Sequence, residues 1–245
     1  MTSYQITLFT HVAAGSIALV TFWLAAFLRK GSPRHRRVGQ IYMAAMLFVL
    51  GSGIPLAWFN AQRGNLIGAL FLYYLVLLTG TGVRNGWQAV RLKRDRRGYF
   101  DATYWVLIGA LSAAGVAIIA VGTQVGAPLL QIFGGVGLFA STGAVMAWYR
   151  SPNNPTWWLR EHYTAIIGNG IATHIAFFGI GLRNALPFVD PQTQMMMAWL
   201  TPLAGGLVAT VYLNRKYGRR PASRAWAPHT PVPASVIRAG TVPAG

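Results

Sequence analysis

The chain has 245 residues, of which 54% are hydrophobic, 13% aromatic and only 10% charged. A soluble domain usually carries about 25% charged residues, so this composition excludes an ordinary water-exposed surface and indicates a membrane protein. The formal net charge is +17, yet the Lys and Arg residues lie beside apolar stretches instead of forming one basic domain, so no nucleic-acid partner is expected. The lack of cysteine excludes disulfides, iron–sulfur clusters and thiolate metal sites.

Seven apolar runs predict seven transmembrane helices, because roughly twenty apolar residues cross a hydrocarbon core about 30 Å thick. In chain order they are residues 6–28, 39–61, 66–90, 102–123, 128–149, 159–182 and 195–213. We therefore expect an all-α, polytopic integral membrane protein whose transmembrane domain covers residues 1–217. Residues 218–245 are rich in Pro, Ala and Arg and lack a helical period, which predicts a disordered basic tail in the cytoplasm.

Basic residues alternate between the predicted loops. They fill the connections after the first, third and fifth helices and follow the seventh, whereas the opposite loops contain only Arg63 and Arg183. Because cytoplasmic loops are enriched in Lys and Arg, we expect the N-terminus outside and the C-terminus in the cytoplasm. Arg84, near the inner end of the third helix, can extend towards the cytoplasmic headgroups. The expected partners are the bilayer and anionic headgroups at the basic loops.

The acidic residues restrict the chemistry further. The chain contains only Asp95, Asp101, Glu161 and Asp190, and none lies in the middle of a predicted helix. This excludes paired-carboxylate catalysis and a carboxylate proton relay deep in the membrane. Small residues recur within the helices, among them Gly51, Gly53, Gly80, Gly82, Gly134, Gly135, Gly137, Gly168, Gly170, Gly205 and Gly206. They predict close helix packing, since lipid tails provide no hydrophobic drive for helix association.

Two histidines lie within the predicted helices, at similar expected depths from the outer side. His11 is about 8 Å deep in the first helix and His174 about 12 Å deep in the sixth, at about 1.5 Å per residue. Gly15 and Gly170 lie one turn from these histidines and are expected to leave room beside each imidazole. Two imidazoles facing each other across a bundle are suitable ligands for haem b iron or for a transition metal such as copper. A contact with a neighbouring helix is the structural alternative.

A second candidate metal site lies near the cytoplasmic side. It comprises His35 in the first basic loop, and Glu161 and His162 at the start of the sixth predicted helix. These side chains have the ligand types of a zinc hydrolase with an open position for water, although they match no recognised spacing and leave no obvious general base. His162 and His174 are twelve residues apart and so point about 120° apart around an ideal helix, which weakens a two-haem cytochrome.

The first third of the chain resembles a family of predicted bacterial multi-spanning membrane proteins of unknown function. The resemblance rests on His11, on Lys30-Gly31, and on Arg34-His35-Arg36-Arg37 followed by Gly39 and Tyr42, and it continues through Gly53. That family commonly has a later His-Arg element with Trp and Met before a helix, whereas this chain has Arg160-Glu161-His162-Tyr163. The resemblance implies the fold and a bacterial inner-membrane location, and it implies no activity.

Three functions of different classes are compatible with these features. The first is a membrane redox protein that binds haem b or a metal through His11 and His174. The second is a small-solute permease or channel, in which histidines and Gly-rich segments line a polar path. The third is a non-catalytic assembly or accessory protein, whose glycine-rich faces dock another membrane protein or a second copy of the chain.

Overall fold

The computed structural model describes residues 2–217, apart from the side chains of residues 180, 181, 183 and 184. Regular structure in this part is helical throughout: α1 (Ser3–Phe27), α2 (Pro33–Gln62), α3 (Leu66–Arg91), α4 (Arg96–Tyr99), α5 (Ala102–Gln124), α6 (Pro128–Arg150), η1 (Ser151–Asn153), α7 (Trp157–Ala185) and α8 (Pro191–Tyr217). The all-α prediction is confirmed, and each predicted helix corresponds to one long helix. The short helices α4 and η1 were not predicted. The predicted tail, residues 218–245, lies outside the described residues.

Short polar residues define where several helices begin. The side chains of Thr2, Ser32, Asn65 and Asp101 each accept a backbone N–H in the first turn of α1, α2, α3 and α5, respectively. Such N-caps satisfy donors that have no partner within the helix. Proline occupies the first position of α2 and α6, where its missing N–H costs nothing. Local sequence therefore determines the ends of these elements.

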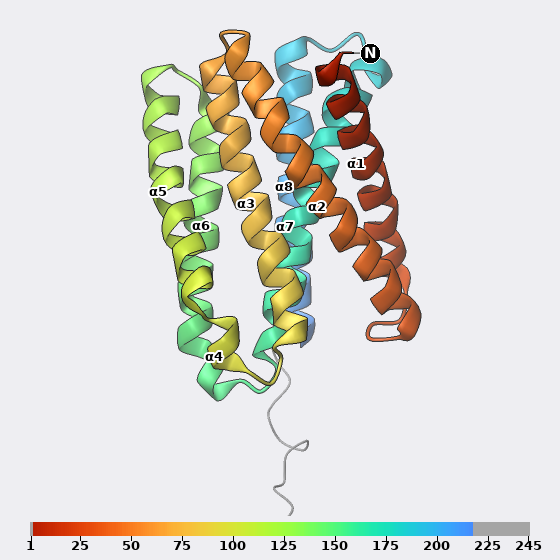
Figure 1. Cartoon of the computed structure of the whole chain (residues 1–245), viewed down its shortest axis with the longest axis vertical. Coiled ribbons are helices and arrows are strands. Elements are labelled where there is room, and N and C mark those ends of the chain that lie inside the picture. Colours follow the sequence, from red (N-terminus) through yellow and green to blue (C-terminus); the bar gives the residue numbers. More distant parts are fainter. Residues whose placement is uncertain (1, 218–245) are drawn as a thin grey trace, which may run out of the picture.

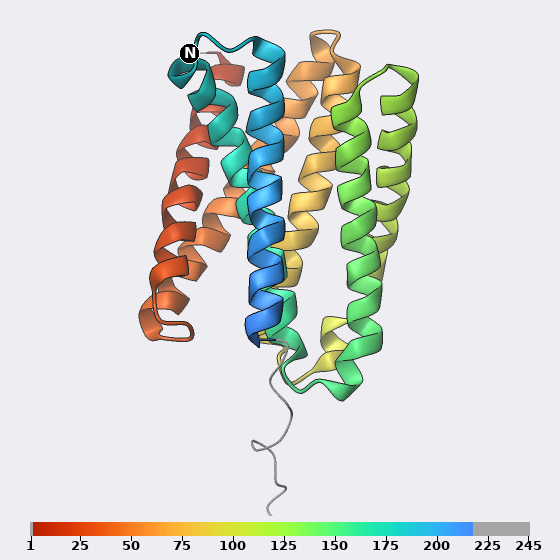
Figure 2. The same cartoon turned by 180° about the vertical axis from the view of Figure 1, so that it is seen from behind.

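The long helices run side by side and form one bundle (Figure 1). The pair α1 and α2 lies on one side and the pair α5 and α6 on the other, with α3 between them. Helix α7 packs against both α3 and α8, and more weakly against α1 and α6. Seen from behind, α8 covers part of α7 on the outside of the bundle (Figure 2). This arrangement makes α7 an interior helix.

Within residues 2–217, six helices are long and apolar enough to cross a membrane: α1, α2, α3, the α4–α5 segment, α6 with η1, and α8. Large apolar side chains such as Phe9, Phe48 and Phe139 are exposed on the outside of these helices. Both features are typical of a multi-pass integral membrane protein. Helix α7 has 29 residues and is not among the six, which are counted over the described residues alone; the side chains of residues 180, 181, 183 and 184 of α7 are not described.

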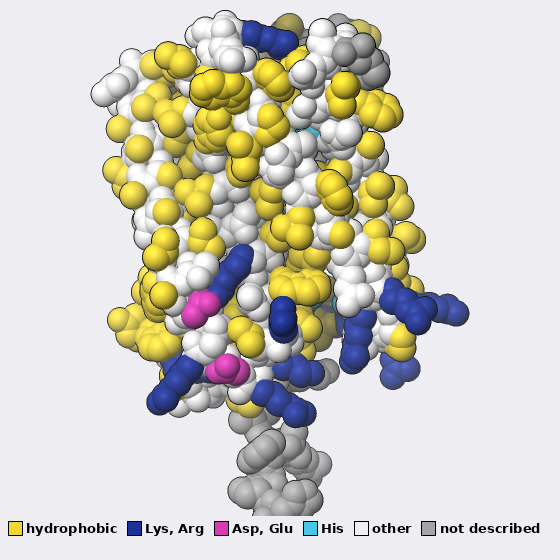
Figure 3. Space-filling model, in the orientation of Figure 1, with side chains coloured by type: hydrophobic (Ala, Val, Ile, Leu, Met, Phe, Trp, Pro, Cys, Tyr) yellow, Lys and Arg dark blue, Asp and Glu magenta, His cyan; other side chains and the backbone are white. Residues whose placement is uncertain are grey.

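Lys and Arg side chains gather at one end of the bundle, the lower end in Figure 3. We call this the basic end; it comprises residues 28–37, 91–101, 150–160 and 214–217. The α1–α2, α3–α5 and α6–α7 connections and the last turn of α8 meet there. Arg63, in the α2–α3 connection, lies at the opposite end. The predicted alternation of charge is thus present in the structure.

The close packing predicted from glycine is confirmed at some positions only. A Cβ atom at Gly134 on α6 would lie 2.6 Å from the carbonyl oxygen of Gly115 on α5. In contrast, a Cβ at Gly51, Gly135, Gly168 or Gly205 would meet nothing within 4 Å. The first group allows two backbones to approach. The second group faces open space, so glycine in a membrane helix does not by itself indicate a helix contact.

Candidate functional site

His11 lies on α1 and joins this helix to α2. Its Nδ1 atom is 2.9 Å from the Ser52 hydroxyl oxygen. That hydroxyl donates its own proton to the carbonyl oxygen of Phe48 at 2.6 Å, so it can only accept from the imidazole. We therefore assign the His11 proton to Nδ1 from the hydrogen-bond network.

His174 lies on α7 and uses both ring nitrogens within the chain. Its Nδ1–H donates to the carbonyl oxygen of Gly170 at 2.7 Å. Its Nε2 accepts the indole N–H of Trp23, on α1, at 2.9 Å. The rings of Phe22 and Trp23 meet the imidazole edge-on, with centroids 5.5 and 5.6 Å away. The two bonds identify a neutral imidazole that connects α7 to α1.

Phenylalanine side chains occupy the space beside the two predicted glycines. A Cβ atom at Gly15 would lie 3.8 Å from the ring of Phe177, and one at Gly170 would clash with the ring of Phe22. The first contact places Gly15 on α1 level with residue 177 on α7, and the second places Phe22 level with residue 170. His174 lies between residues 170 and 177, so it is roughly level with residue 18 on α1. His11 is therefore about 10 Å away along α1, or about seven residues at 1.5 Å each.

His11 and His174 thus have different partners and lie at different levels along the bundle. Among the contacts of the described residues, none joins one of these histidines to the other. Haem binding by this pair would require the Trp23 N–H to leave His174 and a phenylalanine ring to move. The assignment remains a prediction that a spectrum can test.

At the basic end, the structure brings together His35 and His162 but not Glu161. The Nδ1 of His35 is 3.1 Å from the Ala25 carbonyl oxygen, and that of His162 is 2.9 Å from the Gly86 carbonyl oxygen. The two imidazoles are within electrostatic range of each other and of Lys30. In the described residues, neither Nε2 atom forms a hydrogen bond. Glu161 instead accepts the Tyr99 hydroxyl at 3.3 Å.

A complete metal site is not formed by the described side chains. None of their groups of three or more His, Cys, Asp or Glu residues lies close enough together to hold a metal ion. A metal at His35 and His162 would have to take its further ligands from solvent or from a bound molecule.

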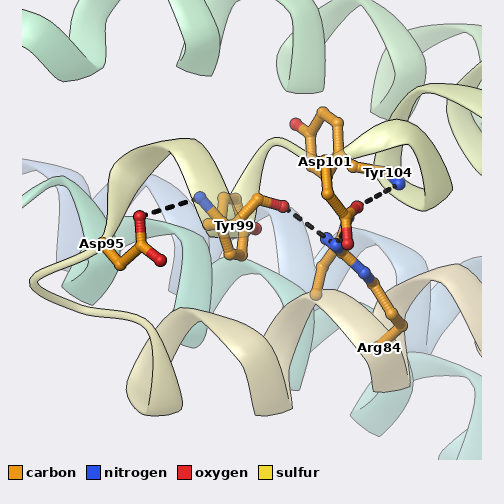
Figure 4. A network of polar contacts seen from close by, with 7 residues as sticks. Arg84, Asp95, Tyr99, Asp101 and Tyr104 are labelled. Atoms are coloured by element: carbon orange, nitrogen blue, oxygen red, sulfur yellow. Dashed lines mark hydrogen bonds and ion pairs between the residues drawn. The ribbon is translucent and has the colours of Figure 1, made fainter.

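Arg84 pairs with Asp101, which lies at the basic end and is 42% exposed (Figure 4). The extension of Arg84 towards the headgroups stays a prediction. The Nη2 atom of Arg84 lies 2.6 Å from the Asp101 carboxylate and donates to the Tyr99 carbonyl oxygen at 2.9 Å. Asp101 also accepts the backbone N–H of Tyr104 at 2.8 Å and so caps α5. The ion pair with Asp101, a carboxylate 17 residues away that the α3–α5 connection brings back to α3, was not predicted from the sequence.

One face of α7 carries buried polar groups that the predictions did not include. With its amide oriented by the hydrogen-bond network, Asn169 donates to the Thr79 carbonyl oxygen and accepts from the Val83 N–H, both at 3.1 Å. Thr173, one turn later, donates to the Asn169 carbonyl oxygen at 3.0 Å. Nearby, the buried Tyr42 hydroxyl lies beside Thr173. An Asn within an apolar run was the signal that could have identified this face.

A cavity of about 460 Å³ opens at the basic end, between the α6–α7 connection, the first turns of α7 and the last turns of α8. Arg160 and Arg215 line it from α7 and α8, respectively. Tyr163 and Asn214 also line it and are joined by a hydrogen bond of 2.6 Å. Neither arginine forms an ion pair with a described residue. We call this cavity the α7–α8 pocket.

Positive charge is concentrated around the α7–α8 pocket. Helix α7 begins there; the Thr156 side chain does not cap it, but the backbone N–H groups of Thr156 and Trp157 donate to Asn154, so the site's positive charge comes mainly from the two arginines. Glu161 lies near Arg160 and lines a separate cavity of about 70 Å³. On the neighbouring α1–α2 connection, partial burial and the nearby Lys216 ammonium lower the pKa of Lys30. The pocket is therefore suited to an anion.

The sequence interpretation assigned Arg160 and Arg215 to membrane topology alone. They are 55 residues apart in the chain, and only the packing of α8 against α7 places them on one pocket. In comparisons with family models, with curated proteins and with solved structures, no match to the chain was found.

Proposed function

We propose that the chain is a seven-span protein of a bacterial inner membrane, with the N-terminus outside and the basic end in the cytoplasm. The support for the seventh span is the length of α7 and its position between α3 and α8. The support for the orientation is the charge difference between the two ends, because Lys and Arg remain on the cytoplasmic side during insertion. The bacterial inner membrane follows from the family resemblance described above.

The orientation can be tested with single cysteines, because the native chain has none. Gln124→Cys lies at the end of α5 opposite the basic end, and Arg94→Cys lies in the basic α3–α4 connection; both side chains are exposed. A membrane-impermeant maleimide should label Gln124→Cys in intact cells and should label Arg94→Cys only after the membrane is opened. The reverse pattern would overturn the proposed orientation.

For the activity, we propose recognition of a phosphate-bearing ligand at the cytoplasmic membrane surface. The α7–α8 pocket is the observation that carries this proposal. Its volume of about 460 Å³ is in the range of small-molecule sites. The guanidinium groups of Arg160 and Arg215 can each bind phosphate oxygens in a bidentate manner. A permease or a ligand-sensing protein would use such a pocket.

Ligand-induced stabilisation of the detergent-purified protein tests this activity, with glycerol 3-phosphate as the soluble probe. Binding to the folded state should raise the Tm in proportion to the logarithm of probe concentration above Kd. Arg160→Gln and Arg215→Gln should each reduce the shift strongly. Arg94→Gln removes the same charge from the same end but not from the pocket, so it should respond like the native chain. Equal shifts in all four proteins would rule out the pocket.

A second candidate function, redox or metal chemistry, is favoured by the orientation of His35 and His162. Backbone carbonyls fix the Nδ1–H of both rings, which is the usual support of metal-ligating histidines. A haem or transition metal held there would supply one-electron chemistry. The opposing observation is the Lys30 ammonium nearby, which repels a cation.

An absorption spectrum before and after dithionite, with metal analysis, tests both histidine pairs. If His35 and His162 hold the cofactor, His35→Ala and His162→Ala should lose the Soret band or metal, while His11→Ala and His174→Ala retain it. The opposite pattern would assign the cofactor to His11 and His174. A colourless, metal-free protein from haem-replete cells would exclude both pairs.

A further inference from the structure

The α7–α8 pocket is continuous with the surface that faces the hydrocarbon. Val211 lines the pocket and is 49% exposed. Val208 and Leu207, three and four residues earlier on α8, are 70% and 47% exposed and lie on the same face of the helix. A strip of apolar side chains therefore leads from the pocket towards the middle of the membrane.

The polar part of the pocket lies at the level of the lipid headgroups. Arg160 is in the first turn of α7, and Arg215 is in the last turn of α8, at the basic end. The Tyr163–Asn214 hydrogen bond joins the two helices within the lining of the pocket. The lining of the pocket thus changes from charged to apolar within a few residues along α8. A lipid changes in the same way at the boundary between its headgroup and its acyl chains.

We propose that the ligand of the α7–α8 pocket is an anionic phospholipid of the cytoplasmic leaflet. Arg160 and Arg215 bind its phosphodiester, and an acyl chain lies along Val211, Val208 and Leu207. This inference rests on the proposed function, because it names the source of the phosphate group. Two arginines without an ion pair to a described residue favour an anionic lipid over a zwitterionic one, whose own cation competes for the phosphate.

The test measures phosphatidylglycerol bound to the full chain by native mass spectrometry, after reconstitution with equal amounts of phosphatidylglycerol and phosphatidylcholine and extraction into mild detergent. The native chain should retain phosphatidylglycerol at one molecule per protein. Arg160→Gln and Arg215→Gln should each weaken retention by roughly tenfold or more, the equivalent of losing one charge-assisted hydrogen bond. Both side chains are exposed, so helix content measured by circular dichroism should be unchanged. Arg94→Gln should retain the lipid.

The outcomes separate this inference from the proposed function. If lipid retention is the same in all variants while the glycerol 3-phosphate response depends on Arg160 and Arg215, the pocket binds a soluble phosphate and the lipid assignment is wrong. If neither measurement depends on these arginines, the lipid assignment and the proposed function both fail. Arginine-dependent retention of phosphatidylglycerol that excludes phosphatidylcholine supports the lipid.

Discussion

At the scale of single residues, the membrane domain pairs its polar groups internally. His174 is bonded at both nitrogens, Asn169 is bonded to the backbone of α3, and Arg84 is paired with Asp101. Unpaired polar groups are expensive in hydrocarbon, so an intramembrane His or Asn has a partner whether or not it has a function. A polar residue in an apolar run therefore predicts a contact more securely than it predicts a ligand.

The Arg84–Asp101 pair provides a test at this scale. Asp101→Ala removes both the ion pair and the N-cap of α5, and should lower the free energy of unfolding by about 2 kcal/mol. Asp101→Asn keeps an acceptor for both contacts, so it should lower the free energy of unfolding by less than half as much as Asp101→Ala. The Tm of the detergent-purified variants measures the difference. Equal losses would show that the charge, and not the acceptor, is what matters at this position.

At the scale of helices, contact between backbones distinguishes the glycines that helix packing requires from those that it does not require. The α5–α6 pair meets at Gly115 and Gly134, whereas the adjacent Gly135 faces open space. Gly134 and Gly135 are neighbours in the sequence of α6, so amino-acid composition cannot distinguish their roles. The register between α5 and α6 distinguishes the two glycines, because it aligns Gly134 with the backbone of α5.

Gly134 and Gly135 therefore form a matched pair for mutation. Gly134→Ala should destabilise the protein by about 1–3 kcal/mol, since the new methyl group would meet the Gly115 carbonyl oxygen and Ile119. Gly135→Ala should be neutral or slightly stabilising, because alanine favours the helix. Thermal unfolding of the two variants in one detergent provides the comparison. A larger loss for Gly135→Ala would contradict the packing described above.

At the scale of the whole molecule, the neighbouring helices supply the partners of α7. Its polar side chains contact α1 through His174 and α3 through His162 and Asn169. Its partners also shield it from lipid, since it packs against α3 and α8.

It follows that α7 should insert poorly when it is isolated. In a glycosylation-mapping assay of single segments, Leu66–Arg91 should insert efficiently and Trp157–Ala185 should insert only partly, because isolated polar side chains contact lipid. Replacing Asn169 and His174 by Leu in the isolated segment should restore insertion. Efficient insertion of the unmodified α7 segment would contradict this dependence on its neighbours.

Sequence alone determined the all-α class, the positions of the long helices and the uneven charge of the two ends. These properties depend on local apolar length, capping residues and charge, which can be read within one segment. The candidate sites were less predictable. Only the tertiary structure decided that His11 and His174 have separate partners, that Glu161 faces away from His35 and His162, and that Arg160 and Arg215 share a pocket. The physical reason is that these relations depend on helix order, rotation and register, which hydropathy does not encode.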